Sequence, residues 1–293
     1  MGYRLIKGEF HLFYQGETRR SGSRPDGDSC WFKPNKKALF KGIDTEEPGR
    51  TVEFNKGGMA QLRFEAIDAL EVHFQGTHQE MGLAKRARDE TMENAGFTSV
   101  EYGGSDETTA QAATPHPVPG YVLTRKIDPN RRPVCFVFAG KTNEGDGKNV
   151  FLDTTRVKKS LNAKLMSAGH AYPSYYTGLP TDLRRQFSSL ANGAKGKGLG
   201  PKDTTKSGLK VTGAASLETS VIWPKLFRRL ADFVKTKRPI SQFPAWLEED
   251  SDRNDRMWIV SRAELGNLTD AIAVKNGKVR MVLDPSDLII VPR

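Results

Sequence analysis

The chain has 293 residues, of which 37% are hydrophobic, so it can bury a sizeable core in one large domain or two ordinary ones. Its formal net charge of +10 favours a polyanionic partner, with nucleic acid as the leading candidate, because each Lys or Arg that meets a phosphate releases condensed counterions. The two cysteines, Cys30 and Cys135, argue against a disulfide framework and cannot form a zinc site alone.

The first residues predict no secretory signal. The stretch MGYRLIKGEFHLFY alternates between polar and apolar side chains, whereas a secretory signal has a continuous apolar core. No apolar run in the chain is long enough to cross a bilayer. We therefore expect no membrane partner, and a cytoplasmic or nucleoid-associated location in preference to secretion.

The first third of the chain predicts short strands separated by polar loops. Alternation over residues 3–14 predicts one strand, and a second begins at Cys30 after a basic loop. Residues 36–58 form a long polar connection that ends in a Gly-Gly turn signal, which is typical of an insertion in a hairpin. A third strand begins at Leu62 and breaks into an acidic turn.

The middle of the chain adds helices to these strands. Three stretches have the pattern of a helix: 81–95, 157–167 and 182–194. Residues 101–120 are polar and proline-rich, so we expect a surface loop that contains neither helix nor strand. Two strands follow, at 121–126 and 134–138. Short strands with interspersed helices indicate an α+β fold built on a closed five-stranded barrel of the oligonucleotide-binding type.

The C-terminal part has a different composition. Residues 201–216 are polar and rich in Gly, Lys and Thr, which predicts a linker. Residues 217–235 predict an amphipathic helix, and two strand-like pieces close the chain. We therefore expect a barrel domain over residues 1–200 and a smaller accessory domain of mixed structure over 201–293, which is also a candidate surface for a protein partner.

Two motifs place carboxylates in short turns. The stretch RPDGDS holds Asp26 and Asp28 on either side of a glycine, and LRFEAIDALEVHF ends its strand in a turn with Asp68 and Glu71. The three aspartates are candidate ligands of a divalent cation, because Mg²⁺ and Ca²⁺ prefer oxygen ligands and leave room for water and substrate. Taken alone, Asp-Gly-Asp is also an ordinary turn.

Two arginines suit the binding of a phosphate. Arg63 belongs to the strand before the acidic turn, and Arg132 ends the motif DPNRR just before the apolar strand PVCFVFAG. A guanidinium presents paired donors that match phosphate oxygens, and it keeps its charge. An isolated arginine is usually a solvated surface charge, so the spacing of these two relative to the acidic motifs is what matters.

In this order, DGDS, then R-x-x-x-x-D-x-x-E, then Asp-x-x-x-Arg, the motifs resemble the staphylococcal nuclease family. The helix GLAKRARDETMENAG and the segment SLNAKLMSAGHAYPSYY agree in order and spacing, and the resemblance covers roughly residues 3–200. It implies a five-stranded barrel with three helices. It also implies a calcium-dependent, sugar-nonspecific nuclease that hydrolyses DNA and RNA and leaves 3′-phosphates.

The resemblance implies a role for each candidate residue. The three aspartates would hold Ca²⁺, with Mg²⁺ or Mn²⁺ as alternatives, and Glu71 would activate or orient the attacking water. The two arginines, at the family's spacing, would stabilise charge on the phosphate. Tyr172 and Tyr175 fall in the segment where the family has tyrosines beside the nucleotide. For Tyr175, contact with substrate and simple packing both stay open.

The chain departs from the family within these motifs. Ala69 and Leu70 replace the family's Thr-Pro, which removes a threonine oxygen near the metal. Pro129 and Asn130 replace a Lys-Tyr pair, and Arg131 stands where the family has glycine. The first departure concerns the metal shell, and the second concerns the grip on the terminal phosphate of the substrate.

Two alternatives to a nuclease follow from the same sequence. One is a noncatalytic nucleic-acid-binding barrel, and the other is a scaffold whose C-terminal domain binds a partner. The complete set of acids and arginines favours the enzyme, because a pure binding module has no need of it. The five histidines show no H-E-x-x-H spacing, so a zinc hydrolase of that type has little support.

Overall fold

The computed structural model describes residues 2–15, 20–45 and 49–292. They form two compact units, each made of two stretches of the sequence. The first unit comprises Met1–Glu65 and Arg88–Leu165, and the second comprises Ala66–Ala87 and Met166–Arg293. This division differs from the boundary expected at residue 200, because a segment from the middle of the chain packs with the C-terminal part.

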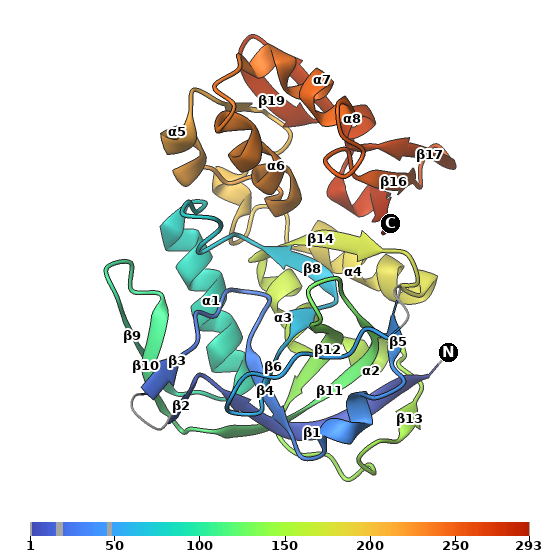
Figure 1. Cartoon of the computed structure of the whole chain (residues 1–293). Helices are drawn as coiled ribbons and strands as arrows, with labels where there is room; N and C mark the ends of the chain where they lie inside the picture. The colour runs from blue at the N-terminus through green and yellow to red at the C-terminus, as the bar shows by residue number, and fades with distance from the viewer. Residues whose placement is uncertain (1, 16–19, 46–48, 293) are drawn as a thin grey trace. The chain divides into compact units, whose positions relative to one another are not determined.

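The first unit contains a nearly closed, barrel-like sheet (Figure 1). Its strands are β1 (Tyr3–His11), β4 (Trp31–Pro34), β5 (Asp44–Thr45), β6 (Ala60–Gln61), β7 (Arg63–Phe64), β11 (Val118–Ile127), β12 (Pro133–Ala139) and β13 (Asn149–Val150). The main order is β6-β4-β1-β11-β12-β7, with β13 paired to β1 and β5 to β11. Residues 60–64 contribute both ends of this order, since β6 pairs with β4 and β7 pairs with β12.

Among the described residues this sheet has eight strands, and the expected number of five is not matched. The difference arises from short pieces. β6 and β7 are successive parts of one stretch that is interrupted at Leu62, and β5 and β13 have two residues each.

Aromatic side chains fill the barrel, and two glycines make room for them. Phe10 and Phe32 are fully buried, with ring centroids 5.6 Å apart. Gly8 and Gly120 face each other across β1 and β11. A Cβ at Gly120 would lie 2.2 Å from the Phe10 ring, and one at Gly8 would lie 2.7 Å from the Phe32 ring, so this close approach requires glycine.

The prediction of a strand-free loop over residues 101–120 is wrong. β9 (Ser99–Gly103) and β10 (Thr109–Thr114) form an antiparallel hairpin. Pro115 and Pro117 lie in the connection between β10 and β11, so neither strand of the hairpin loses a ladder hydrogen bond. A second, smaller ribbon pairs β2 (Phe13–Gln15) with β3 (Arg20–Gly22).

The three predicted helices are present. They are α1 (Met81–Ala95), α3 (Leu161–Ala168) and α4 (Thr181–Gly193), and the short α2 (Thr154–Val157) precedes α3. Gly96, with φ of 114°, closes α1 and donates its N–H to the carbonyl of Met92. α3 starts later than predicted because the Ser160 hydroxyl accepts the N–H of Ala163 and caps the helix.

The second unit combines two sheets with helices. Its strands are β8 (Ala66–Ala69), β14 (Ala171–Tyr176), β15 (Leu209–Lys210), β16 (Arg256–Ile259), β17 (Glu264–Asn267), β18 (Ile272–Lys275), β19 (Lys278–Met281) and β20 (Leu288–Ile290). One sheet has the order β17-β16-β20-β14-β8 and the other β15-β19-β18. The unit also contains α4. After residue 200 the chain adds the helices α5 (Ala214–Glu218), α6 (Pro224–Val234), α7 (Phe243–Glu248) and α8 (Leu268–Ala271). β14 joins β8 from mid-chain to β20 from the C-terminus, which explains why the unit is discontinuous in sequence.

The expected linker over residues 201–216 is part of the folded second unit. β15 pairs with β19, and Val211 lies in the hydrophobic core. Thr205 is also buried, where its hydroxyl accepts the N–H of Trp223 at 3.1 Å. The polar residues of this segment therefore bind backbone groups inside the unit. Within the described ranges, no helix is long and apolar enough to cross a membrane.

Candidate functional site

In the first unit, backbone pairing brings three of the candidate residues to one edge of the barrel. The carbonyl of Asp28 accepts the N–H of Phe64 at 2.9 Å, one residue after Arg63 in β7. Arg63 is in register with Val134 of β12, and Arg132 precedes that residue by two positions. The DGDS turn and both arginines are therefore neighbours along adjacent strands.

Arg132 is held by an aspartate within its own turn. Its backbone N–H donates to Oδ1 of Asp128 at 2.8 Å, and its Nε donates to Oδ2 at 2.8 Å. The preceding Arg131 has φ of 60°, the left-handed conformation that the family's glycine adopts readily. Among the described residues, Nη1 of Arg132 has no hydrogen-bond partner. The turn thus orients Arg132 and leaves one donor arm for a ligand.

The DGDS turn directs one carboxylate inward. Oδ1 of Asp26 is buried and has no hydrogen-bond partner within the described part of the chain. Burial raises the pKa of the nearby Cys30 thiol, and the negative charge of Asp26 raises it further. Thr91 of α1 donates its hydroxyl to the carbonyl of Gly27 at 2.7 Å and fixes the turn.

In the second unit, one arginine binds both remaining acids. Asp68 lies in β8, and Glu71 follows it in the turn. Arg228 of α6 donates from Nη2 to Oδ2 of Asp68 at 2.7 Å and from Nη1 to Oδ1 at 3.2 Å. The same Nη1 also donates to Oε1 of Glu71. Three carboxylate oxygens therefore converge on a single guanidinium.

This cluster is largely shielded from solvent. The side chain of Asp68 is 4% exposed, that of Glu71 14% and that of Arg228 22%. Burial alone would lower the pKa of Arg228, but the charges of Asp68 and Glu71 outweigh it and hold the pKa well above its ordinary value. Arg228 is therefore a permanent counter-ion of the acidic pair in this conformation.

Buried hydrogen bonds fix the chain on both sides of this ion pair. Gln79 donates its side-chain amide to the carbonyl of Ile222 at 2.9 Å, and its Oε1 accepts the N–H of Glu71 at 3.2 Å. Trp223, just before α6, donates its indole N–H to the carbonyl of Pro173 in β14 at 3.1 Å. Both the acidic turn and the start of α6 are thereby held in place.

The other basic residues of α6 also have partners within the unit. Nζ of Lys225 and Nε of Arg229 bind the two carboxylate oxygens of Asp255 at 2.8 and 2.9 Å. Burial raises the pKa of Asp255, but its two basic neighbours outweigh this and lower it. Lys235, the residue that follows α6, binds the side chains of Gln75 and Asp232. The basic residues of this helix therefore serve internal ion pairs, and the sequence pattern showed only that they lie on an amphipathic helix.

The two candidate tyrosines are packed inside the second unit. Tyr175 is fully buried, and its hydroxyl lies 3.0 Å from Oγ of Ser188. A buried ring cannot stack on a nucleotide, so the packing interpretation of Tyr175 holds in this conformation. Tyr172 is 6% exposed and donates its hydroxyl to Oδ1 of Asp203 at 2.9 Å, which ties that ring to the protein as well.

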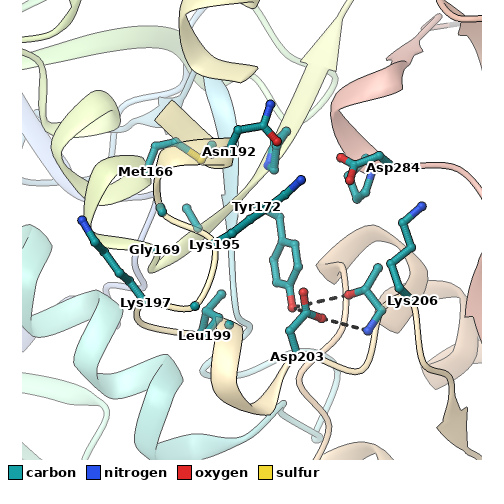
Figure 2. A pocket seen from close by; sticks show the side chains of 18 residues that line it. Met166, Gly169, Tyr172, Asn192, Lys195, Lys197, Leu199, Asp203, Lys206 and Asp284 are labelled. Atoms are coloured by element: carbon teal, nitrogen blue, oxygen red, sulfur yellow. Dashed lines mark hydrogen bonds between the residues drawn. The ribbon is translucent and has the colours of Figure 1, made fainter. Parts of the chain in front are cut away.

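Tyr172 borders a cavity of about 300 Å³ in the second unit (Figure 2). Its lining includes Asp203, Lys206 and Lys195, and the backbone N–H of Thr205 donates to Asp203 at 2.8 Å. In the part of the chain that the structure describes, none of the six candidate acids and arginines lines this cavity. It is therefore separate from the predicted site.

The acids that the family resemblance assigns to a metal have suitable chemistry, and they belong to two different units: Asp26 and Asp28 to the first, Asp68 to the second. Within the described ranges, no group of three or more His, Cys, Asp or Glu side chains is placed to hold a metal ion. Both oxygens of Asp68 are engaged by Arg228. A divalent ion therefore fits at Asp68 only after Arg228 has moved away, whereas the unpartnered Oδ1 of Asp26 suits a cation directly.

Comparison with models of known protein families found none that matches this chain, and comparison with curated proteins found no match.

Proposed function

We propose that this chain is a nuclease that hydrolyses the phosphodiester bonds of DNA and RNA, built on a barrel of the oligonucleotide-binding type. The observation that supports it best is the convergence of the DGDS turn with Arg63 and Arg132 at one edge of the barrel. The net charge of +10 agrees with a polyanionic substrate. The nearly closed, barrel-like sheet of the first unit supports the choice of a barrel as the scaffold.

The arginines supply the electrostatic part of the proposed chemistry. Phosphoryl transfer places negative charge on the equatorial oxygens, and donors that are already oriented stabilise that charge without reorganisation. Arg132 meets this requirement because Asp128 holds its Nε and backbone N–H while Nη1 extends beyond the pair. Arg63 is the proposed second guanidinium, carried by β7 at the position in register with Val134 of β12.

The acids supply the remaining roles on the strength of the resemblance. Asp26, Asp28 and Asp68 are the proposed ligands of Ca²⁺, or of Mg²⁺ or Mn²⁺, and a bound ion would act as a Lewis acid on the phosphate. Glu71 is the proposed group that orients the attacking water. In this conformation Glu71 and Asp68 bind Arg228, so both roles require that ion pair to open.

The ion pair also favours a second candidate function, a noncatalytic nucleic-acid-binding barrel. A carboxylate that is bound to a guanidinium is a poor base and a poor metal ligand. If the ion pair of Arg228 with Asp68 and Glu71 stays closed, these two acids take no part in chemistry. Arg63 and Arg132 of the barrel would still bind phosphates.

One experiment separates the two functions. Purified full-length protein is incubated with plasmid DNA and with RNA in Ca²⁺, Mg²⁺, Mn²⁺ or EDTA, and binding to the same substrates is measured in parallel at two salt concentrations. The nuclease proposal predicts cleavage that falls about 10²-fold or more in Arg132→Ala but little in Arg131→Ala, the neighbouring control. Salt-sensitive binding without cleavage would support the noncatalytic barrel, and the absence of both would refute both proposals.

A further inference from the structure

Asp68 and Glu71 already share a cation in this structure, and that cation belongs to the chain. Nη1 of Arg228 contacts both carboxylates, and Nη2 contacts the second oxygen of Asp68. We propose that Arg228 is an internal cation that occupies the place of a divalent ion at Asp68 and Glu71 and excludes the ion from this pair. The inference deepens the proposed function, because it concerns the acids assigned to that reaction.

The geometry makes the two cations mutually exclusive. An ion that bridged Asp68 and Glu71 would need an oxygen from each, and Arg228 engages both oxygens of Asp68 and Oε1 of Glu71. A divalent ion next to a guanidinium would also be repelled strongly, since a site only 4% to 22% exposed is poorly screened by water. Binding of the ion therefore requires Arg228 to leave.

The position of Arg228 is built into the fold of the second unit. Trp223 and Gln79 hold the start of α6 and the acidic turn through buried hydrogen bonds. Lys225 and Arg229, one helical turn apart, both bind Asp255, so they cannot replace Arg228 at the acidic pair. Arg228 is thus the cation of α6 that binds Asp68 and Glu71 and offsets part of their negative charge.

The consequence is a site whose affinity for metal is set by an arginine. With Arg228 in place, its positive charge balances one of the two carboxylate charges, so the cluster has a smaller net negative charge and is stabilised without a metal. Without Arg228, two adjacent, nearly buried carboxylates repel each other, and a divalent cation becomes the natural replacement. Removal of Arg228 should therefore convert a site that is indifferent to metal into one that depends on it.

The test uses the full-length protein and three variants. Arg228→Met keeps the apolar stem and removes the charge, Arg228→Lys keeps one charge without the second donor arm, and Arg229→Met removes the neighbouring cation of the same helix as a matched control. Calcium binding is measured by titration calorimetry, and thermal unfolding is measured in EDTA and in excess CaCl₂. Neither readout requires cleavage activity.

We expect Arg228→Met to bind Ca²⁺ about tenfold or more tightly than the wild type. Its unfolding midpoint should fall in EDTA and recover in CaCl₂, because a ligand of the native state stabilises it. Arg229→Met should lose stability but keep the wild-type response to calcium. Addition of Asp68→Asn to Arg228→Met should abolish the gain in calcium binding, which places the new site at this pair.

Several outcomes would overturn the inference. One is an equal calcium affinity in the wild type and in Arg228→Met. Another is a recovery of the unfolding midpoint that NaCl of the same ionic strength reproduces. A third is a gain in calcium binding that Asp68→Asn leaves intact. If Arg228→Met does not fold in either buffer, Arg228→Lys decides, because it should show an intermediate response to calcium and a wild-type response would refute the proposal. Failure of the nuclease function would appear instead as uncleaved substrate in every variant, whatever the calcium affinity.

Discussion

Truncation after Gly200 tests how the second unit is assembled. The composition of the chain predicts that residues 1–200 form a domain of their own, whereas the second unit combines residues 66–87 with 166–293. Among the described residues, 27 buried hydrophobic side chains form one core cluster of this unit, and only five of them precede residue 201. The five are Leu70, Val72, Ala84, Tyr172 and Leu199.

The loss of the other 22 side chains uncovers these five. Each large side chain among them contributes roughly 1.5–3 kcal/mol by its burial, so four of them represent about 6–12 kcal/mol. This is comparable to the whole free energy of unfolding of a typical domain, about 5–15 kcal/mol. β14 would also lose its parallel partner β20, and Asp68 and Glu71 would lose Arg228. We therefore expect residues 66–87 and 166–200 to be unfolded or aggregation-prone in the fragment.

Hydrogen exchange with mass spectrometry, combined with urea unfolding, measures this directly. The amides of β8 and β14 should be protected in the full chain and exchange rapidly in the 1–200 fragment, while a control truncated after Ile290 should behave as the full chain does. A soluble fragment that unfolds cooperatively at the same urea concentration as the full chain, with β8 still protected, would refute this reasoning.

Three further predictions concern single side chains. Burial raises the pKa of Glu65 above its ordinary value of 4.5, despite three nearby basic residues. The folded state therefore binds a proton more tightly than the unfolded state, and the stability of the protein should fall as pH rises above about 4.5. Glu65→Gln should flatten this decline in the urea midpoint measured across pH. The folded-state pKa of Asp255 is lowered, so its contribution to the free energy of unfolding is present above the ordinary pKa of 3.8 and is lost as pH falls through the lower folded value. Asp255→Asn should be less stable than the wild type at neutral pH, and its stability should lack this acid-dependent decrease in denaturant unfolding across pH. Trp223→Phe leaves the buried carbonyl of Pro173 without its donor and should cost about 1–3 kcal/mol in denaturant unfolding, whereas a cost near zero would show that the indole hydrogen bond is dispensable.

Elements with a local sequence signal could be predicted before the structure was known. The helix at 81–95 was predictable because apolar residues recur at helical spacing and Gly96 can adopt the left-handed closing conformation. Alternation likewise located the main strands of the barrel, although β6 and β7 are split at Leu62. The motifs also assigned Arg63, Arg132 and the DGDS turn to one site, and in the first unit Phe64, next to Arg63, pairs with the carbonyl of Asp28 while Arg63 itself is in register with Val134 of β12.

Tertiary structure alone decided the partners of the acidic turn and the extent of the second unit. Arg228 is 157 residues from Glu71 and 160 from Asp68, and a helix with several basic residues does not indicate which carboxylate each will bind. The segment 201–216 has the polar, Gly- and Thr-rich composition of a linker. The sequence does not show that its polar groups bind atoms far away in the chain, as the Thr205 hydroxyl does when it accepts the N–H of Trp223. Ion pairs and buried hydrogen bonds of this kind depend on which segments pack together in the folded chain. The local periodicity of the sequence does not contain that information.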